Sequence, residues 1–149
     1  MITYADIASA LGDTLSGLVP GCGVYSIART EDFKRPAFFF YLKPILTEAA
    51  NMRTRHNVVA AYIDYHQKVK DEADMYKVAG KLRDALGFAY KVKSRYLDVT
   101  EFDFEFVGKE RNIMEMSATF DYFDPIEADD KAELMEEAIV NVKLREVYE

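Results

Sequence analysis

The chain has 149 residues, of which 50% are hydrophobic and 30% charged, so it is long enough for one domain with a substantial core. This composition excludes a disordered or collagen-like chain, and the longest apolar run, Ala37–Leu42, is too short to span a membrane. The N-terminal segment carries acid where a secretory signal carries base, so no signal peptide is expected. Cys22 is the only cysteine, which suits a reducing compartment.

The net charge of −7 is unevenly distributed along the chain. Residues 33–70 carry seven Lys and Arg against two acids, whereas residues 96–127 carry two against nine. An acidic chain does not bind DNA tightly by itself, because such binding depends on neutralising phosphates. Segments of opposite charge instead favour head-to-tail self-association, although ordinary scatter of surface charge would give the same pattern.

The first half of the chain predicts one helix followed by three strands. Residues 4–18 place Ile7, Leu11, Leu15 and Leu18 on one helical stripe, after a capping box formed by Thr3 and Asp6. A short strand at 24–27 and a polar loop at 29–35 follow. Residues 37–42 form a strand that is apolar on both faces, and Pro44 ends its pairing or places it at a sheet edge. After a loop at 47–54, a strand at 55–66 completes a long hairpin.

The second half predicts a helix, three strands and a last helix. Asp71 caps a helix over 71–86 that buries Met75, Ala79, Leu82 and Leu86 and ends at Gly87. Strands follow at 88–92, 97–107 and 112–123, and a helix is expected at 129–144. In the strand at 97–107, alternation places Phe102, Phe104 and Phe106 inward and Glu101, Asp103 and Glu105 outward.

The order α-β-β-β-α-β-β-β-α predicts an α+β fold with a mostly antiparallel sheet, a long β-hairpin and helices packed on the sheet. We expect residues 1–149 to form a single α+β domain. Within it, 129–149 would be a C-terminal helix and tail, a candidate arm onto a neighbouring subunit.

No catalytic constellation is evident. His56 and His66 stand ten residues apart, a spacing that matches no zinc site, and Cys22 has no partner base nearby in the sequence. Nucleotide-binding glycine motifs are absent, so no cofactor and no enzymatic activity are expected. Glu101, Asp103 and Glu105 share a strand face and could hold a hard cation, but a solvated face opposite a basic surface explains them better.

Two basic loops are candidates for protein interaction. One contains Phe33, Lys34, Arg35 and Pro36, and the other contains Met52, Arg53 and Arg55. Their cations could contact phosphate or a protein acid, and the overall acidity favours a protein partner. The ten Tyr and ten Phe exceed what a core of this size needs, so part of the Tyr set is expected at an interface.

The order of several segments resembles a known family over about residues 4–124. Those segments are Phe33-Lys34-Arg35-Pro36-Ala37-Phe38-Phe39-Phe40-Tyr41-Leu42-Lys43-Pro44, Arg53-Thr54-Arg55, Ala61-Tyr62-Ile63-Asp64-Tyr65, Ala79-Gly80-Lys81-Leu82 and Tyr96-Leu97-Asp98-Val99. Together they are similar to the tail terminator (tail completion) proteins of tailed bacteriophages and of phage-like elements of Gram-positive bacteria.

The resemblance implies a structural protein of the virion tail, assembled in the host cytoplasm. It would form a homo-oligomeric ring, typically a hexamer, on the head-proximal end of the tail tube. The ring would end tube polymerisation and join the head through a connector or stopper protein, with DNA only passing through the lumen and no membrane contact. By position, Phe33–Pro36 and Met52–Arg55 would be loops at the ring surface.

Three alternatives stay open at this point. Another head–tail joining or neck protein would share the composition and the ring. A small metal-dependent enzyme would use Glu101, Asp103 and Glu105. A monomeric regulatory binding module is the third reading. The ring number, the face that lines the lumen and the type of tail do not follow from the sequence.

Overall fold

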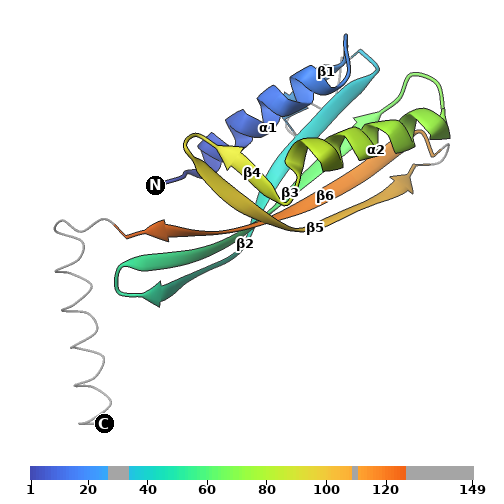
Figure 1. Cartoon of the computed structure of the whole chain (residues 1–149). Coiled ribbons are helices and arrows are strands. Elements are labelled where there is room, and N and C mark those ends of the chain that lie inside the picture. Colours follow the sequence, from blue (N-terminus) through green and yellow to red (C-terminus); the bar gives the residue numbers. More distant parts are fainter. Residues whose placement is uncertain (27–33, 109–110, 127–149) are drawn as a thin grey trace.

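The computed structural model describes residues 1–26, 34–108 and 111–126. Within them lie two helices and six strands (Figure 1). In chain order these are α1 (Tyr4–Leu18), β1 (Gly23–Ser26), β2 (Ala37–Asn51), β3 (Thr54–His66), α2 (Glu72–Leu86), β4 (Ala89–Val92), β5 (Arg95–Val107) and β6 (Ile113–Pro125). The predicted fold class, α+β with a mostly antiparallel sheet, is confirmed. The helix expected at 129–144 lies outside the described residues.

Both helices begin at the predicted caps. The Thr3 side chain accepts a hydrogen bond from the Asp6 N–H at 3.1 Å, and the Asp6 carboxylate accepts one from the Thr3 N–H at 2.9 Å. The Asp71 side chain accepts hydrogen bonds from the Ala73 and Asp74 N–H groups in the first turn of α2, at 3.1 and 3.3 Å. At the other end of α2, Gly87 adopts φ 64°, a conformation that side-chain-bearing residues rarely adopt. Capping therefore fixes where each helix starts and where α2 stops.

The six strands form one sheet in the order β1-β2-β3-β6-β5-β4. All neighbours are antiparallel except β1, which pairs in parallel with Ala37–Phe40 at the start of β2. The long strands β3 and β6 occupy the centre and pair along their whole length, from Thr54 opposite Pro125 to His66 opposite Ile113.

The hairpin of β2 and β3 is longer than the sequence predicted. The loop expected at 47–54 is wrong: β2 continues to Asn51, and only Met52 and Arg53 form the turn. Of the two alternatives for Pro44, the sheet edge holds: the register shifts between Pro44 and Leu46, and no described strand pairs with the outer side of β2 at this position. In Figure 1 the end of this hairpin extends beyond the layer of helices.

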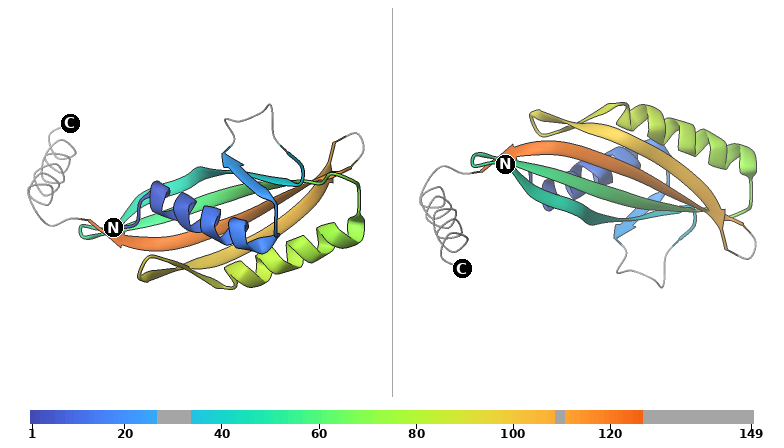
Figure 2. Two further views of the ribbon diagram at one scale, coloured as in Figure 1. Left: turned by 90° about the horizontal axis from the view of Figure 1, so that it is seen from above. Right: turned by 90° about the horizontal axis from the view of Figure 1, so that it is seen from below.

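The core lies between the helices and one face of the sheet (Figure 2). Ile7, Leu11 and Leu15 of α1 and Met75, Leu82 and Leu86 of α2 are almost fully buried, as their helical spacing predicted. The sheet contributes Phe38, Ile63, Leu97, Met114, Met116 and Phe120, all essentially inaccessible. The opposite face of the sheet carries no helix in the described part of the chain; Figure 2, right, shows the sheet in front and the helices behind it.

Neither described helix is long and apolar enough to cross a membrane.

Truncation of the central core aromatic should strongly destabilise the fold. Phe120 is fully buried and stacks on Tyr90 with ring centroids 5.5 Å apart. We expect Phe120→Ala to lower the free energy of unfolding by about 3–5 kcal/mol, measured by urea denaturation. Phe88, which is 92% exposed, is the matched control. Phe88→Ala should change stability by less than about 0.5 kcal/mol, and an equal effect of both substitutions would contradict the placement of the core.

Candidate interaction surfaces

The predicted acidic face lies on the side of the sheet that no described helix covers. Glu101, Asp103 and Glu105 are exposed on β5, while Phe102 and Phe106 turn toward the helices. Phe104, the middle phenylalanine, is 37% exposed and packs on the Tyr76 ring of α2, so its inward direction is confirmed but its burial is partial. Strand alternation therefore correctly separated the two faces of β5.

Two further carboxylates that sequence reasoning missed lie beside this face. Glu115 of β6 is opposite Glu105 of β5 on one side and opposite Asp64 of β3 on the other. Burial and the nearby Glu115 raise the pKa of the Asp64 carboxyl to about 6. These carboxylates come together only through the register in which β3, β6 and β5 pair. The positions of the single residues in the sequence do not reveal that register.

A pocket of about 140 Å³ opens within this cluster. It is lined by Tyr62, Asp103, Phe104, Glu105, Glu115 and Ser117. Tyr62 also stacks on Tyr41 of β2, with ring centroids 5.1 Å apart. The pocket thus combines carboxylates with an aromatic wall, a combination suited to the long stem and charged end of a basic side chain.

Among the described residues, no group of three or more His, Cys, Asp or Glu side chains is placed to hold a metal ion. Glu101, Asp103 and Glu105 follow one another along a strand and do not converge on one point. The arrangement therefore suits a basic protein surface better than an inner-sphere cation site.

The second predicted loop forms the tip of the β2–β3 hairpin. Met52 is 44% exposed, and Arg53 is also exposed at the turn. Two hydrogen bonds of 2.8 Å hold the turn. The Arg53 N–H donates to the Asn51 side chain, and the Arg53 carbonyl accepts from the Ile126 N–H. Arg55 is half-buried. Neither arginine forms an ion pair within the described residues.

The first predicted loop lies at the opposite end of β2, so the two basic segments are not brought together. Lys34 is exposed, whereas Arg35 and Pro36 are half-buried. Arg35 donates a hydrogen bond to the Gln67 carbonyl at 3.1 Å, which fixes this segment to the end of β3. Phe33 lies outside the described residues.

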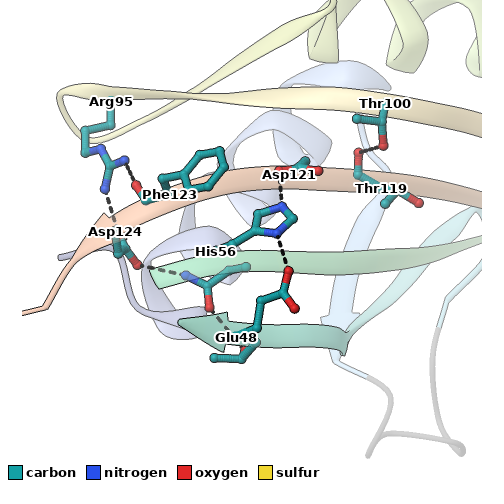
Figure 3. A network of polar contacts seen from close by, with 10 residues as sticks. Glu48, His56, Arg95, Thr100, Thr119, Asp121, Phe123 and Asp124 are labelled. Atoms are coloured by element: carbon teal, nitrogen blue, oxygen red, sulfur yellow. Dashed lines mark hydrogen bonds and ion pairs between the residues drawn. The ribbon is translucent and has the colours of Figure 1, made fainter. Parts of the chain in front are cut away.

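A histidine joins three strands near the end of the projecting hairpin (Figure 3). His56 Nδ1 lies 3.2 Å from Glu48 of β2, and its Nε2 lies 2.8 Å from Asp121 of β6. Hydrogen bonds to these two carboxylates raise the pKa of His56, since the imidazolium can donate to both. Its ring also stacks on Phe123, with centroids 4.7 Å apart. His56 is therefore a structural link between strands.

A buried carboxylate fixes the other face of the sheet near the end of the hairpin. Asp124 is 3% exposed and accepts hydrogen bonds from the Ile2 N–H at 3.3 Å and from the Asn57 amide at 3.4 Å. Arg95 of β5 forms an ion pair with it and also donates to the Phe123 carbonyl (Figure 3). One side chain thus joins the N-terminus, β3 and β5.

Cys22 and the two histidines do not come together as a nucleophile and base in the described part of the chain. Burial raises the pKa of the Cys22 thiol to about 11, which keeps it protonated and unreactive. His66 packs edge-on against Phe39, and burial lowers its pKa. His56 and His66 lie ten residues apart on one strand, so they do not act on a common centre.

Removal of the buried carboxylate should cost far more stability than removal of an exposed one. Asp124→Ala leaves Arg95 without its ion-pair partner and the Ile2 N–H without its acceptor, so we expect a loss of about 3–5 kcal/mol in urea denaturation. Asp84 pairs with Arg83 in an exposed ion pair at 3.3 Å and supplies the control. Asp84→Ala should cost less than about 1 kcal/mol; similar losses for both would contradict the anchoring role of Asp124.

The two histidines should titrate on opposite sides of the ordinary value of 6.5, His56 above it and His66 below it. Because folding raises the pKa of His56, its contribution to stability is fully present below the unfolded pKa and is lost as the pH rises through the folded pKa. NMR titration of the imidazole protons measures both values. A His56 midpoint at or below 6.5, or no change in its titration in Glu48→Gln, would contradict the interactions with Glu48 and Asp121.

Comparison with known proteins identifies the family to which the chain belongs. The sequence matches no curated protein. Residues 6–132 match the family model described as phage tail terminator protein, which covers most of the chain. Members of this family are structural components of the phage tail and interact with other tail and head components. The chain therefore belongs to the phage tail terminator family.

Proposed function

We propose that this protein caps the head-proximal end of the tail tube as a homo-oligomeric ring, ends tube polymerisation and provides the surface that joins the head. The observation that carries this proposal is the family match over residues 6–132. A ring of six copies, the tube protein below it and a connector or stopper protein above it are the partners that this role requires. Assembly in the cytoplasm of a Gram-positive host belongs to the same proposal.

The projecting hairpin supports a role in assembly. Ile45, Leu46 and Met52 are 53%, 39% and 44% exposed near its end, and Phe123 beside it is 50% exposed. Exposed apolar side chains on a projecting element fit a protein–protein contact. The hairpin is therefore the element that we expect to contact a neighbouring subunit or the tube.

The sheet also offers open edges to a partner. Strand β1 covers only the start of β2, and β4 covers only Arg95–Asp98 of β5, so long stretches of both strands have no described neighbour on their outer side. Open edges can pair with a strand of another chain through backbone hydrogen bonds. This supports assembly of several copies into a larger structure.

The remaining elements of the proposal concern the whole chain and the passing DNA. Residues 1–149 would act as a single domain, with 129–149 as an arm onto a neighbouring subunit. The acidic character of the chain suits a ring through which DNA slides without binding, because like charges repel. No observation favours an enzyme, so a metal-dependent activity is not part of the proposal.

Deletion of the gene should lengthen the tails. We expect negative-stain images of the lysate to show tails of irregular, excessive length beside unattached full heads, with normal particles restored by the gene supplied in trans. Tails of normal length beside unattached heads would point to a neck or joining protein instead. Wholly normal particles would refute both roles.

A further inference from the structure

The uncovered face of the sheet has the features of a docking surface. Four neighbouring carboxylates gather there from three strands, namely Asp64 of β3, Glu115 of β6 and Asp103 and Glu105 of β5. Beside them the stacked pair of Tyr41 and Tyr62 extends the surface onto β2. We call this surface, with its 140 Å³ pocket, the acidic pocket face.

The acidic pocket face lacks a cationic partner in the described part of the chain. None of its four carboxylates forms an ion pair there. Repulsion from Glu115, added to burial, raises the pKa of Asp64. A cation placed in the pocket would relieve this repulsion, so the surface is better suited to a basic partner than to water.

The hairpin tip carries the complementary charge. Arg53 and Arg55 have no ion-pair partner among the described residues, and Glu48, the nearest acid on β2, is bonded to His56. Met52 adds an exposed apolar side chain at the turn. Arginine with an adjacent apolar side chain is a composition enriched at interface centres.

The tip cannot fill the pocket of its own chain. From Arg55 to Tyr62 the strand rises roughly 23 Å, which exceeds the reach of an arginine side chain. Arg55 also alternates with Asn57 and Val59, which are buried on the helix side, whereas the pocket opens on the opposite side. The tip and the pocket therefore lie toward opposite ends of one sheet, and Arg55 lies on the face opposite the pocket.

Because the basic tip and the acidic pocket face are separate on one chain, they can form a contact between two copies of the protein. Two different patches on one subunit produce a heterologous, head-to-tail contact, which closes into a ring when the rotation between subunits permits. We propose that the hairpin tip of one copy, residues 52–55, docks on the acidic pocket face of the next copy, with Arg53 or Arg55 entering the pocket. This inference rests on the proposed ring and names the surfaces that close it.

Charge reversal tests the contact in functioning tails. The variants are Arg53→Glu with Arg55→Glu at the tip, Asp103→Arg with Glu105→Arg at the pocket, and the combination of all four. Purified protein is added to an extract of cells infected with the deletion phage, and the concentration that gives half of the tails normal length is measured. The tip variant and the pocket variant should each raise that concentration at least about tenfold, since each loses the close ion pairs across the interface.

The combined variant separates a direct contact from general damage. It should recover most of the wild-type activity, because glutamates at the tip then meet arginines at the pocket. Lys77→Glu with Lys81→Glu on the exposed side of α2 is the matched control and should behave as wild type. Wild-type activity of both reversed pairs, or no recovery in the combined variant, would overturn the inference. If only the tip pair is defective, the tip binds another protein, such as the tube protein.

Disulfide crosslinking tests the contact between copies separately from the proposed role in ending the tail tube. In a Cys22→Ser background, Arg53→Cys and Glu105→Cys are combined, and oxidation is followed by gel electrophoresis of the purified, concentrated protein and of isolated tails. A head-to-tail contact gives a ladder of covalent oligomers, whereas each single-cysteine variant gives at most a dimer. A ladder in either preparation supports the contact even if deletion leaves tail length normal. Absence of a ladder in both overturns it even if deletion lengthens the tails.

Discussion

One-sided burial is the constraint on which the rest of this structure depends. Both described helices pack on the same face of the six-stranded sheet, so one face provides the core and the other is left to solvent or to a partner. Fully buried side chains such as Phe38 and Phe120 alternate along their strands with residues on the uncovered face. Since side chains alternate along the regular parts of a strand, each core residue there has a neighbour on the uncovered face.

The sequence was most informative where a local rule decides the structure. Capping by Thr3 and Asp71, the helical stripes and the alternation of β5 depend on neighbours within a few residues, so they could be predicted. The extent of β2 could not, because the chain passes Pro44 by shifting register at a sheet edge rather than by ending the strand. The cluster of Asp64 with Glu115 was also missed, because it arises from pairing between strands more than fifty residues apart in the sequence. Of the candidate residues, Met52 and Arg53 of the hairpin tip and the three acids of β5 are exposed on distinct surfaces, whereas Arg55 is half-buried and Arg35 is tied to Gln67.

The polar network near the end of the hairpin explains how a projecting element can keep a defined direction. His56 joins β2, β3 and β6, while Asp124 joins β3, β5 and the N-terminus. The contact between Asp124 and the Ile2 N–H also ties this end of the sheet to the start of α1. These contacts thereby connect the stability of the fold to the position of the tip, and so to the contacts that a terminator must make.

The central claim is that the uncovered face is covered in the assembled tail by the next copy of the chain. Cryo-electron microscopy of the head-proximal end of isolated tails tests it most directly. The account predicts a ring in which the turn at Met52–Arg53 of each subunit lies against Tyr62, Asp103 and Glu105 of its neighbour. A ring in which this face is open to solvent, or is occupied by the tube protein, would contradict it.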